Sequence, residues 1–168
     1  MGYFTKELFH KLKSQGFREF LANLSGIDNL IADPRFHGSG LHFTGPGGNL
    51  NVHADFNRYN TGVLSLDRRV NTFIFLNEEP WPDSYGGHLE LWSRDMAHCS
   101  QRFLPKFGRF VVFTSTDFSY HGHPVPLAAP RGRGRRSMAL YYYTDPAVKE
   151  RPKEECLHHD CSGESHLT

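Results

Sequence analysis

The hydrophobic pattern changes its period near residue 40, and this change limits the possible folds more than any other feature of the chain. Before it, apolar residues recur at the three- and four-residue spacing of helix faces: Phe4, Leu8, Phe9 and Leu12, then Phe17, Phe20, Leu21, Leu24 and Ile27. We expect Gly16 to separate two helices and Ser25-Gly26 to end the second. These helices are expected to cover one face of a sheet.

From Gly40 onward the chain consists of short β-type runs separated by turn residues. The runs are LNVHADF, NTFIFLN, GGHLELW, GRFVVFTS and RRSMALYYYT, with Gly, Pro, Asn and Asp between them. Short strands at such spacing are typical of a sandwich or barrel. We therefore predict a single domain over residues 1–145, with supporting helices over 1–39 and a β core over 40–145. The polar segment 146–168 is predicted to be a surface tail.

Composition excludes several classes of partner. The 168 residues suit one domain, and a net charge of +1 gives no electrostatic attraction to nucleic acid or to anionic membranes. No apolar run approaches the roughly 18 residues of a transmembrane helix, and the N-terminus has no signal-peptide core. The three cysteines, Cys99, Cys156 and Cys161, do not form a disulfide framework. We expect a cytoplasmic protein without nucleic-acid or membrane partners, and composition makes no prediction of its oligomeric state.

His53, Asp55 and His121 form a candidate metal site. In an extended strand, residues i and i+2 point to the same face, so His53 and Asp55 can bind one ion together. Two imidazoles and one carboxylate leave the opposite face of a metal open, which is the ligand set of non-haem Fe(II) oxygenases. His-x-Asp alone is a weak signal among eleven histidines, but a Gly45-Pro46-Gly47-Gly48 turn precedes it and a buried strand precedes His121. Gly122 is expected to relieve crowding beside the distal histidine.

His123 is the rival for the third ligand position. It lies two residues from His121, so a strand can place both side chains on one face. Pro124 follows His123 and biases it toward an extended conformation at the start of a loop. We favour His121 and keep His123 as the alternative.

The order of these landmarks resembles that of the 2-oxoglutarate and Fe(II)-dependent oxygenases, in particular the prolyl-4-hydroxylase-like branch. The resemblance covers residues 40–144 and implies a double-stranded β-helix, or jelly-roll, core. The matching elements, in order, are His53-Ala54-Asp55, the strand RRVNTFIFLN over 68–77, Gly86-Gly87, His121 and Arg135-Arg136-Ser137.

The resemblance implies Fe(II), 2-oxoglutarate and O2 as cofactors, with ascorbate as a possible addition in vitro. His53, Asp55 and His121 would be the metal ligands and catalytic residues. Arg135 would bind the far carboxylate of 2-oxoglutarate, because a planar guanidinium pairs with a carboxylate bidentately. Ser137, on the same strand face, would donate a second hydrogen bond.

Some positions depart from the branch. Phe43 and Phe75 stand where it often uses tyrosine hydroxyls, and phenylalanine donates no hydrogen bond. Asn71 shares a strand face with Phe73 and Phe75, so we place its amide in the cosubstrate pocket as a replacement donor. Alternatively, Asn71 caps a strand end and touches no ligand.

Substrate-side residues are predicted less sharply. Tyr141 is expected either to flank the metal or to pack in the core, as aromatic residues of a closing strand often do. Further side chains are expected either to line an entrance or to pack in the interior: Trp92, Leu89, Asn57, Arg58 and Trp81. The arginines at 131 and 133 are interpreted as part of a solvated loop.

Other metal chemistries fit less well. A zinc hydrolase would not need the Arg135-x-Ser137 strand, and a halogenase of this fold lacks the carboxylate ligand that Asp55 supplies. The segment between Cys156 and Cys161 has crowded candidate zinc ligands, and an unstructured tail is the better interpretation.

The expected function is a dioxygenase that hydroxylates an unactivated C–H bond and releases succinate and CO2. A prolyl or peptidyl substrate, or a small amino-acid-like one, would suit the resemblance. The alternative is a non-catalytic jelly-roll module that binds a metal or ligand, and the phenylalanines at 43 and 75 are its main support.

Overall fold

Two short helices, α1 (Tyr3–Leu12) and α2 (Gln15–Ser25), open the computed structural model, which describes residues 2–36, 38–60 and 64–148. The Ser14 side chain accepts a hydrogen bond from the Phe17 amide, so the break falls before Gly16, which lies inside the first turn of α2. The predicted break at Gly16 is therefore slightly misplaced. Gly26 ends α2 with φ of 67°, as predicted. No helix within the described ranges is long and apolar enough to cross a membrane.

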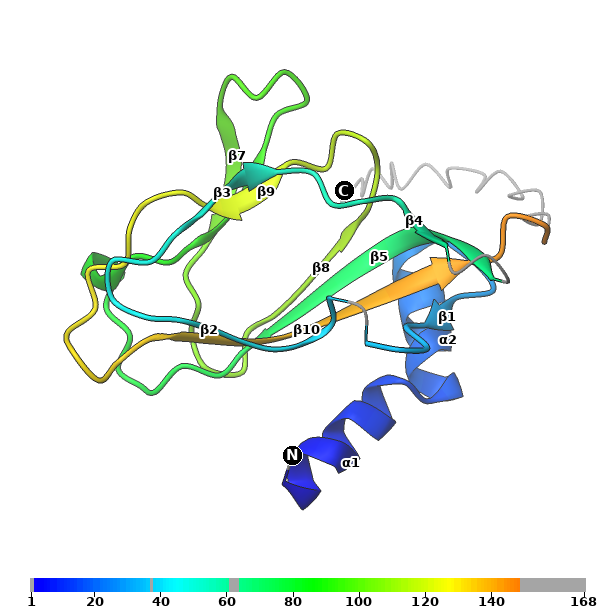
Figure 1. The fold of residues 1–168 in the computed structure, drawn as a ribbon, viewed down its shortest axis with the longest axis horizontal. Coiled ribbons are helices and arrows are strands. Elements are labelled where there is room, and N and C mark those ends of the chain that lie inside the picture. The colour runs from blue at the N-terminus through cyan, green and yellow to red at the C-terminus, as the bar shows by residue number, and fades with distance from the viewer. Residues whose placement is uncertain (1, 37, 61–63, 149–168) are drawn as a thin grey trace, which may run out of the picture.

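The strands form two antiparallel sheets, which lie one above the other in Figure 1. The larger sheet has β10 and β5 at its centre, and the smaller sheet has the order β3-β9-β6-β7. The larger sheet contains β1 (Ile31–Ala32), β2 (Gly40–Thr44), β4 (Arg58–Asn60), β5 (Ser65–Phe75), β8 (Phe110–Thr114) and β10 (Arg135–Thr144). The smaller sheet contains β3 (Leu50–His53), β6 (Leu89–Trp92), β7 (Cys99–Phe103) and β9 (His121–His123), and a 3-10 turn spans Asp83–Tyr85.

This architecture is the predicted mainly β fold with N-terminal helices and a jelly-roll core. The predicted division into a domain over 1–145 and a tail over 146–168 stays a prediction, because the tail from residue 149 onward lies outside the described residues. The same holds for the segment between Cys156 and Cys161.

Alternate residues of β10 supply two different cores. Met138, Leu140 and Tyr142 face the helices, where they pack with Leu21 and Val70. The other face of β10 points to the interior between the sheets. It carries Ala139, Tyr141 and Tyr143, which pack with side chains of β5. The period of two therefore places Arg135 and Ser137 on the interior face, as the sequence predicted.

A β-bulge interrupts the pairing of β5 with β10. Tyr142 pairs with Val70 but Tyr143 pairs with Arg68, so Arg69 is the inserted residue. Such an insertion changes which side chains share a face. As a result Arg68 and Asn71, three positions apart, both point to the interior.

Leu21→Ala is expected to destabilise the fold, whereas Leu24→Ala on the same helix is the matched control. Leu21 is 0% exposed and Leu24 is 59% exposed. We expect the first change to lower the free energy of unfolding by about 2–5 kcal/mol, and the second to alter it by less than about 0.5 kcal/mol. Urea unfolding followed by circular dichroism measures both, and equal losses would contradict the docking of α2 on the sheet.

Candidate metal centre

The three predicted metal ligands converge where β3 and β9 pair. His53 ends β3 opposite His121, which begins β9, and Asp55 lies just beyond the strand. His53 Nε2 is 3.7 Å from Asp55 Oδ1, and His121 Nε2 is 3.6 Å from Asp55 Oδ2. One ligand atom from each residue lies within 4.8 Å of the others. The strand pairing thus brings together residues that are distant in sequence.

Backbone carbonyls orient both imidazoles. The Nδ1 of His53 is 2.8 Å from the Asn51 carbonyl oxygen, and the Nδ1 of His121 is 2.9 Å from the Ser119 carbonyl oxygen. Because a carbonyl only accepts, each Nδ1 is assigned the proton and each Nε2 keeps its lone pair. This tautomer directs both Nε2 atoms toward Asp55. Metal-ligating histidines are commonly oriented in this way.

The electrostatics of the three residues suit a cation. Burial opposes ionisation of Asp55, but the proximity of His53, the charge of Arg68 and the hydrogen bond from Asn71 outweigh it. The pKa of Asp55 therefore lies far below its usual range. Burial lowers the pKa of His121, whereas the nearby Asp55 carboxylate raises the pKa of His53. At neutral pH the site offers an ionised carboxylate and a neutral His121, as a bound metal ion requires.

Two side chains of β5 contact the metal-site carboxylate. Asn71 Nδ2 donates to Asp55 Oδ2 at 2.7 Å, and Arg68 Nη1 forms an ion pair with the same oxygen at 2.8 Å, without hydrogen-bond geometry. Ser115 Oγ donates to Asn71 Oδ1 at 3.0 Å. The predicted role of Asn71 at the cosubstrate stays a prediction, but one of its donors already serves Asp55. The sequence alone indicated no role for Arg68 at the site.

A cavity of about 380 Å³ adjoins the three residues. Beside them, its walls include Arg135 and Tyr141 of β10, Phe43 of β2, and side chains of other strands: Phe73, Leu89 and His123. Tyr141 and Leu89 thus lie where the sequence predicted lining residues. Phe75 is fully buried, and its ring centroid lies 5.0 Å from the Arg135 guanidinium carbon.

Arg135 is a buried cation at this cavity. It is 5% exposed, and its Nε donates to the Gly87 carbonyl oxygen at 2.8 Å. Burial lowers the pKa of Arg135 to about 10, so it remains charged at neutral pH. Among the described residues no carboxylate forms an ion pair with it. Because a buried charge is costly without a partner, this cation is suited to an anionic ligand.

Ser137 and His123 add buried polar atoms near Arg135. Ser137 Oγ and His123 Nδ1 have no hydrogen-bond partner within the described part of the chain. Burial, followed by the charge of Arg135, lowers the pKa of His123 to about 4. His121 joins the cluster with His53 and Asp55, whereas His123 lines the cavity beside it.

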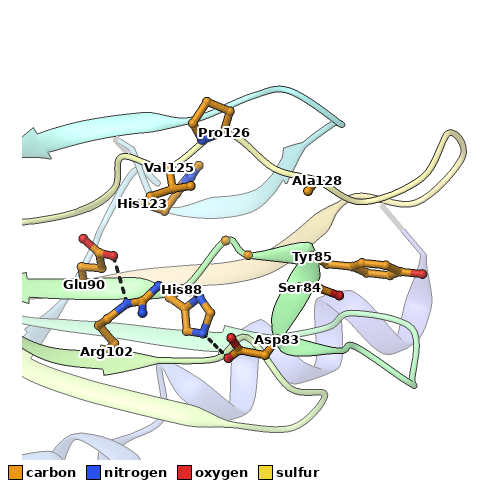
Figure 2. A pocket seen from close by; sticks show the side chains of 12 residues that line it. Asp83, Ser84, Tyr85, His88, Glu90, Arg102, His123, Val125, Pro126 and Ala128 are labelled. Atoms are coloured by element: carbon orange, nitrogen blue, oxygen red, sulfur yellow. Dashed lines mark hydrogen bonds and ion pairs between the residues drawn. The ribbon is translucent and has the colours of Figure 1, made fainter.

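A second cavity, of about 170 Å³, lies beyond Gly87 and shares His123 with the first (Figure 2). Its charged groups pair with one another. His88 Nε2 is 2.9 Å from Asp83 Oδ1, and Arg102 Nε donates to Glu90 Oε1 at 3.1 Å. These pairs form a wall whose charges are already compensated.

Most of the other predicted entrance residues pack or pair elsewhere. Trp81 is 3% exposed and donates to the Gly86 carbonyl oxygen, and Trp92 donates to Glu90. Asn57 bonds to Asp117, and Arg58 pairs with Asp67. None of these four lines the cavity. Trp81 packs in the interior, as the alternative predicted, whereas Asn57 and Arg58 pair with carboxylates. The sequence alone does not show in which direction an aromatic side chain or a polar side chain of a loop points.

More than half of the chain matches the model of a known protein family. The model of the 2OG-Fe(II) oxygenase superfamily matches residues 39–143. The chain belongs to this superfamily. The resemblance seen in the ordered motifs is thereby confirmed, and membership implies Fe(II) and 2-oxoglutarate as cofactors. The residues fit the metal, because two oriented Nε2 atoms and an ionised carboxylate are the donor set that Fe(II) takes in such enzymes.

Solved structures that are similar to this chain include two prolyl hydroxylases. The viral collagen prolyl hydroxylase of Paramecium bursaria Chlorella virus-1 has a TM-score of 0.55 and 15% identity, and the match covers 88% of the present chain and 70% of the viral one. A prolyl-4-hydroxylase of Pseudomonas putida has a TM-score of 0.47 and 22% identity, and the match covers 78% of the present chain. The present chain spans 61% of the length of the Pseudomonas chain. No curated protein matches this sequence.

Gly122→Ala is expected to weaken metal binding by separating β3 from β9. A Cβ atom there would lie 2.8 Å from the Leu50 carbonyl oxygen and 2.9 Å from that of Asn51, so the crowding that glycine relieves comes from the β3 backbone. We expect the Mn(II) dissociation constant, measured by titration calorimetry, to rise by about tenfold or more.

Gly16→Ala is the control for this change, because a Cβ atom at Gly16 meets nothing within 4 Å. It should bind Mn(II) as the wild type does. Equal Mn(II) affinity in the Gly122 variant would mean that the spacing of the two strands does not determine the site.

Proposed function

We propose that this oxygenase uses Fe(II), 2-oxoglutarate and O2 to hydroxylate an unactivated C–H bond of a prolyl, peptidyl or small amino-acid-like substrate. Succinate and CO2 would be the products derived from 2-oxoglutarate. The observation that carries the proposal is one cavity with a carboxylate and two histidines on its wall and a buried arginine beside them, which no carboxylate of the described residues pairs with. Ascorbate would serve as a reductant in the assay.

His53, Asp55 and His121 would hold the iron. Together with 2-oxoglutarate and O2, the bound metal supplies the oxidising power that a C–H bond requires, which amino-acid side chains lack. The chain contributes the orientation of the ligands. Phe113 and Phe73 place their rings 4.9 Å and 6.4 Å from that of His121, which limits water on one side of the site.

Arg135 and Ser137 would bind the far carboxylate of 2-oxoglutarate. The guanidinium is charged and buried, and Ser137 Oγ is a buried hydroxyl with no partner among the described residues. The Gly87 carbonyl fixes the guanidinium through Nε and leaves the two terminal nitrogens for a bidentate contact. Carboxylate binding would thereby satisfy groups that are costly to leave unpaired.

The rim of the cavity supports a substrate with an apolar portion. Phe43 is 64% exposed and Leu50 is 48% exposed, and both line the cavity. A proline ring or a small aliphatic side chain would cover part of this surface. The similar fold of the viral collagen prolyl hydroxylase supports a prolyl or peptidyl substrate.

A non-catalytic ligand-binding module is the second candidate. Phe43 and Phe75 favour it, because neither ring donates the hydrogen bond that tyrosine would give to a bound cosubstrate. Succinate release from 2-oxoglutarate in the presence of Fe(II) and ascorbate separates the two candidates. Release without an added substrate would already favour the enzyme.

Asp55→Ala is expected to reduce iron-dependent succinate release to background, because it removes the one carboxylate ligand. Since that change leaves Arg68 uncompensated, Asp55→Glu is the companion variant: it keeps the charge and moves the oxygens by one methylene. Circular dichroism of both proteins checks folding. Substantial turnover by a folded Asp55→Ala protein would exclude the proposed metal site.

Arg135→Ala is expected to raise the KM for 2-oxoglutarate by about 10- to 150-fold, from the roughly 1.5–3 kcal/mol of a hydrogen bond to a charged group. Arg135→Lys should recover part of this, because it keeps the charge but not the bidentate geometry. Arg131, an exposed arginine of the preceding loop, gives the control Arg131→Ala. Steady-state kinetics at varied 2-oxoglutarate measures all three, and an unchanged KM in Arg135→Ala would remove that residue from the cosubstrate site.

A further inference from the structure

Two side chains of β5 contact the same oxygen of Asp55. Asn71 Nδ2 and Arg68 Nη1 lie 2.7 Å and 2.8 Å from Oδ2. Each oxygen also faces one imidazole beyond hydrogen-bond distance: Oδ1 lies 3.7 Å from His53 Nε2, and Oδ2 lies 3.6 Å from His121 Nε2. Oδ2 alone has two donors from β5 beside it. The two carboxylate oxygens therefore have different surroundings.

Arg68 has little freedom to leave this position. Its side chain is 1% exposed, and its guanidinium carbon lies 4.0 Å from the Phe56 ring centroid and 3.8 Å from that of Tyr141. Stacking between two rings restricts rotation of the planar group and favours the cation. Asp55 is the carboxylate that pairs with Arg68 among the described residues.

Asn71 is fixed from its other end. It is 1% exposed, and its Oδ1 accepts a hydrogen bond from Ser115 Oγ. A hydroxyl that donates to the amide oxygen determines which way the amide faces, so the NH2 group must point to Asp55. The bulge at Arg69 places Arg68 on the same side as Asn71.

We propose that Arg68 and Asn71 are positioning residues that retain Oδ2 of Asp55, so that Oδ1 is the one carboxylate oxygen presented to the metal. This inference rests on the proposed function. A carboxylate that bound through both oxygens would occupy a further coordination position. Retaining Oδ2 keeps that position for the chelating cosubstrate and O2.

The test uses Mn(II), a divalent probe that does not oxidise readily under assay conditions. Its dissociation constant is measured by titration calorimetry for the wild type, Arg68→Met, Arg68→Lys and Asn71→Leu. We expect each neutral replacement to weaken binding by about 10- to 100-fold, the range found when outer contacts of metal ligands are removed. Arg68→Lys should weaken it less, because it keeps the charge but not the stacked plane.

Arg58→Met is the matched control. Arg58 is an exposed arginine that pairs with Asp67, outside the cavity. It should bind Mn(II) as the wild type does. Thermal unfolding in the presence of a chelator shows whether each variant folds, and Asn71→Leu decides the question if Arg68→Met does not fold.

Co(II) substitution provides a second readout that a merely structural role would not change. The intensity of the visible absorption of Co(II) falls as its coordination number rises. If Oδ2 is released, it can join the metal, so the folded Arg68 and Asn71 variants should show a changed Co(II) spectrum. The control variant should show the wild-type spectrum.

Folded Arg68→Met and Asn71→Leu proteins that bind Mn(II) within about twofold of the wild type, with an unchanged Co(II) spectrum, would overturn the inference and leave the proposed function standing. Loss of turnover with unchanged metal affinity and spectrum would also overturn it, because the two residues would then act elsewhere. A wild-type protein that binds no Mn(II) and releases no succinate with Fe(II) would remove the proposed function and this inference together.

Discussion

The antiparallel pairing of β5 with β10 is the contact on which the rest of the structure depends. One face of this strand pair packs against α2, and the other face lines the interior between the two sheets. From the interior face, β10 directs Arg135 toward the cavity and β5 directs Arg68 and Asn71 toward Asp55. The smaller sheet supplies both histidines. The site therefore forms only when the two sheets are held together by the core between them.

The two arginines of the interior, Arg68 and Arg135, differ in how their charges are balanced. Asp55 and Arg68 form a buried pair, and removing one member would leave the other uncompensated, which is strongly destabilising. Arg135 differs, because no carboxylate pairs with it within the described residues. One arginine thus pairs with the carboxylate of the candidate metal site, while the other remains suited to an external anion. The two arginines, both on the central strands, differ in charge balance for this reason.

Much of the site was predictable from the sequence because its signals are local. His53 and Asp55 are two residues apart, and Arg135 and Ser137 follow the alternation of one strand. The ordered motifs around them predicted the superfamily that the family model shows. The helix break was misplaced because a capping serine, rather than the nearby glycine, begins α2. The entrance residues were uncertain because the direction of a loop side chain depends on what packs against it.

The sequence by itself determined the two helices, the change to β structure, the candidate metal ligand set and the superfamily, because each rests on spacing along the chain. Tertiary structure decided which groups surround the carboxylate. Strict alternation would place Arg68 and Asn71 on opposite faces of β5, and only the inserted Arg69 brings them to one face. A bulge depends on the register between strands that are distant in sequence, so no local pattern specifies it. For the same reason, the close approach of β3 to β9 at Gly122 became visible only once the sheets were assembled.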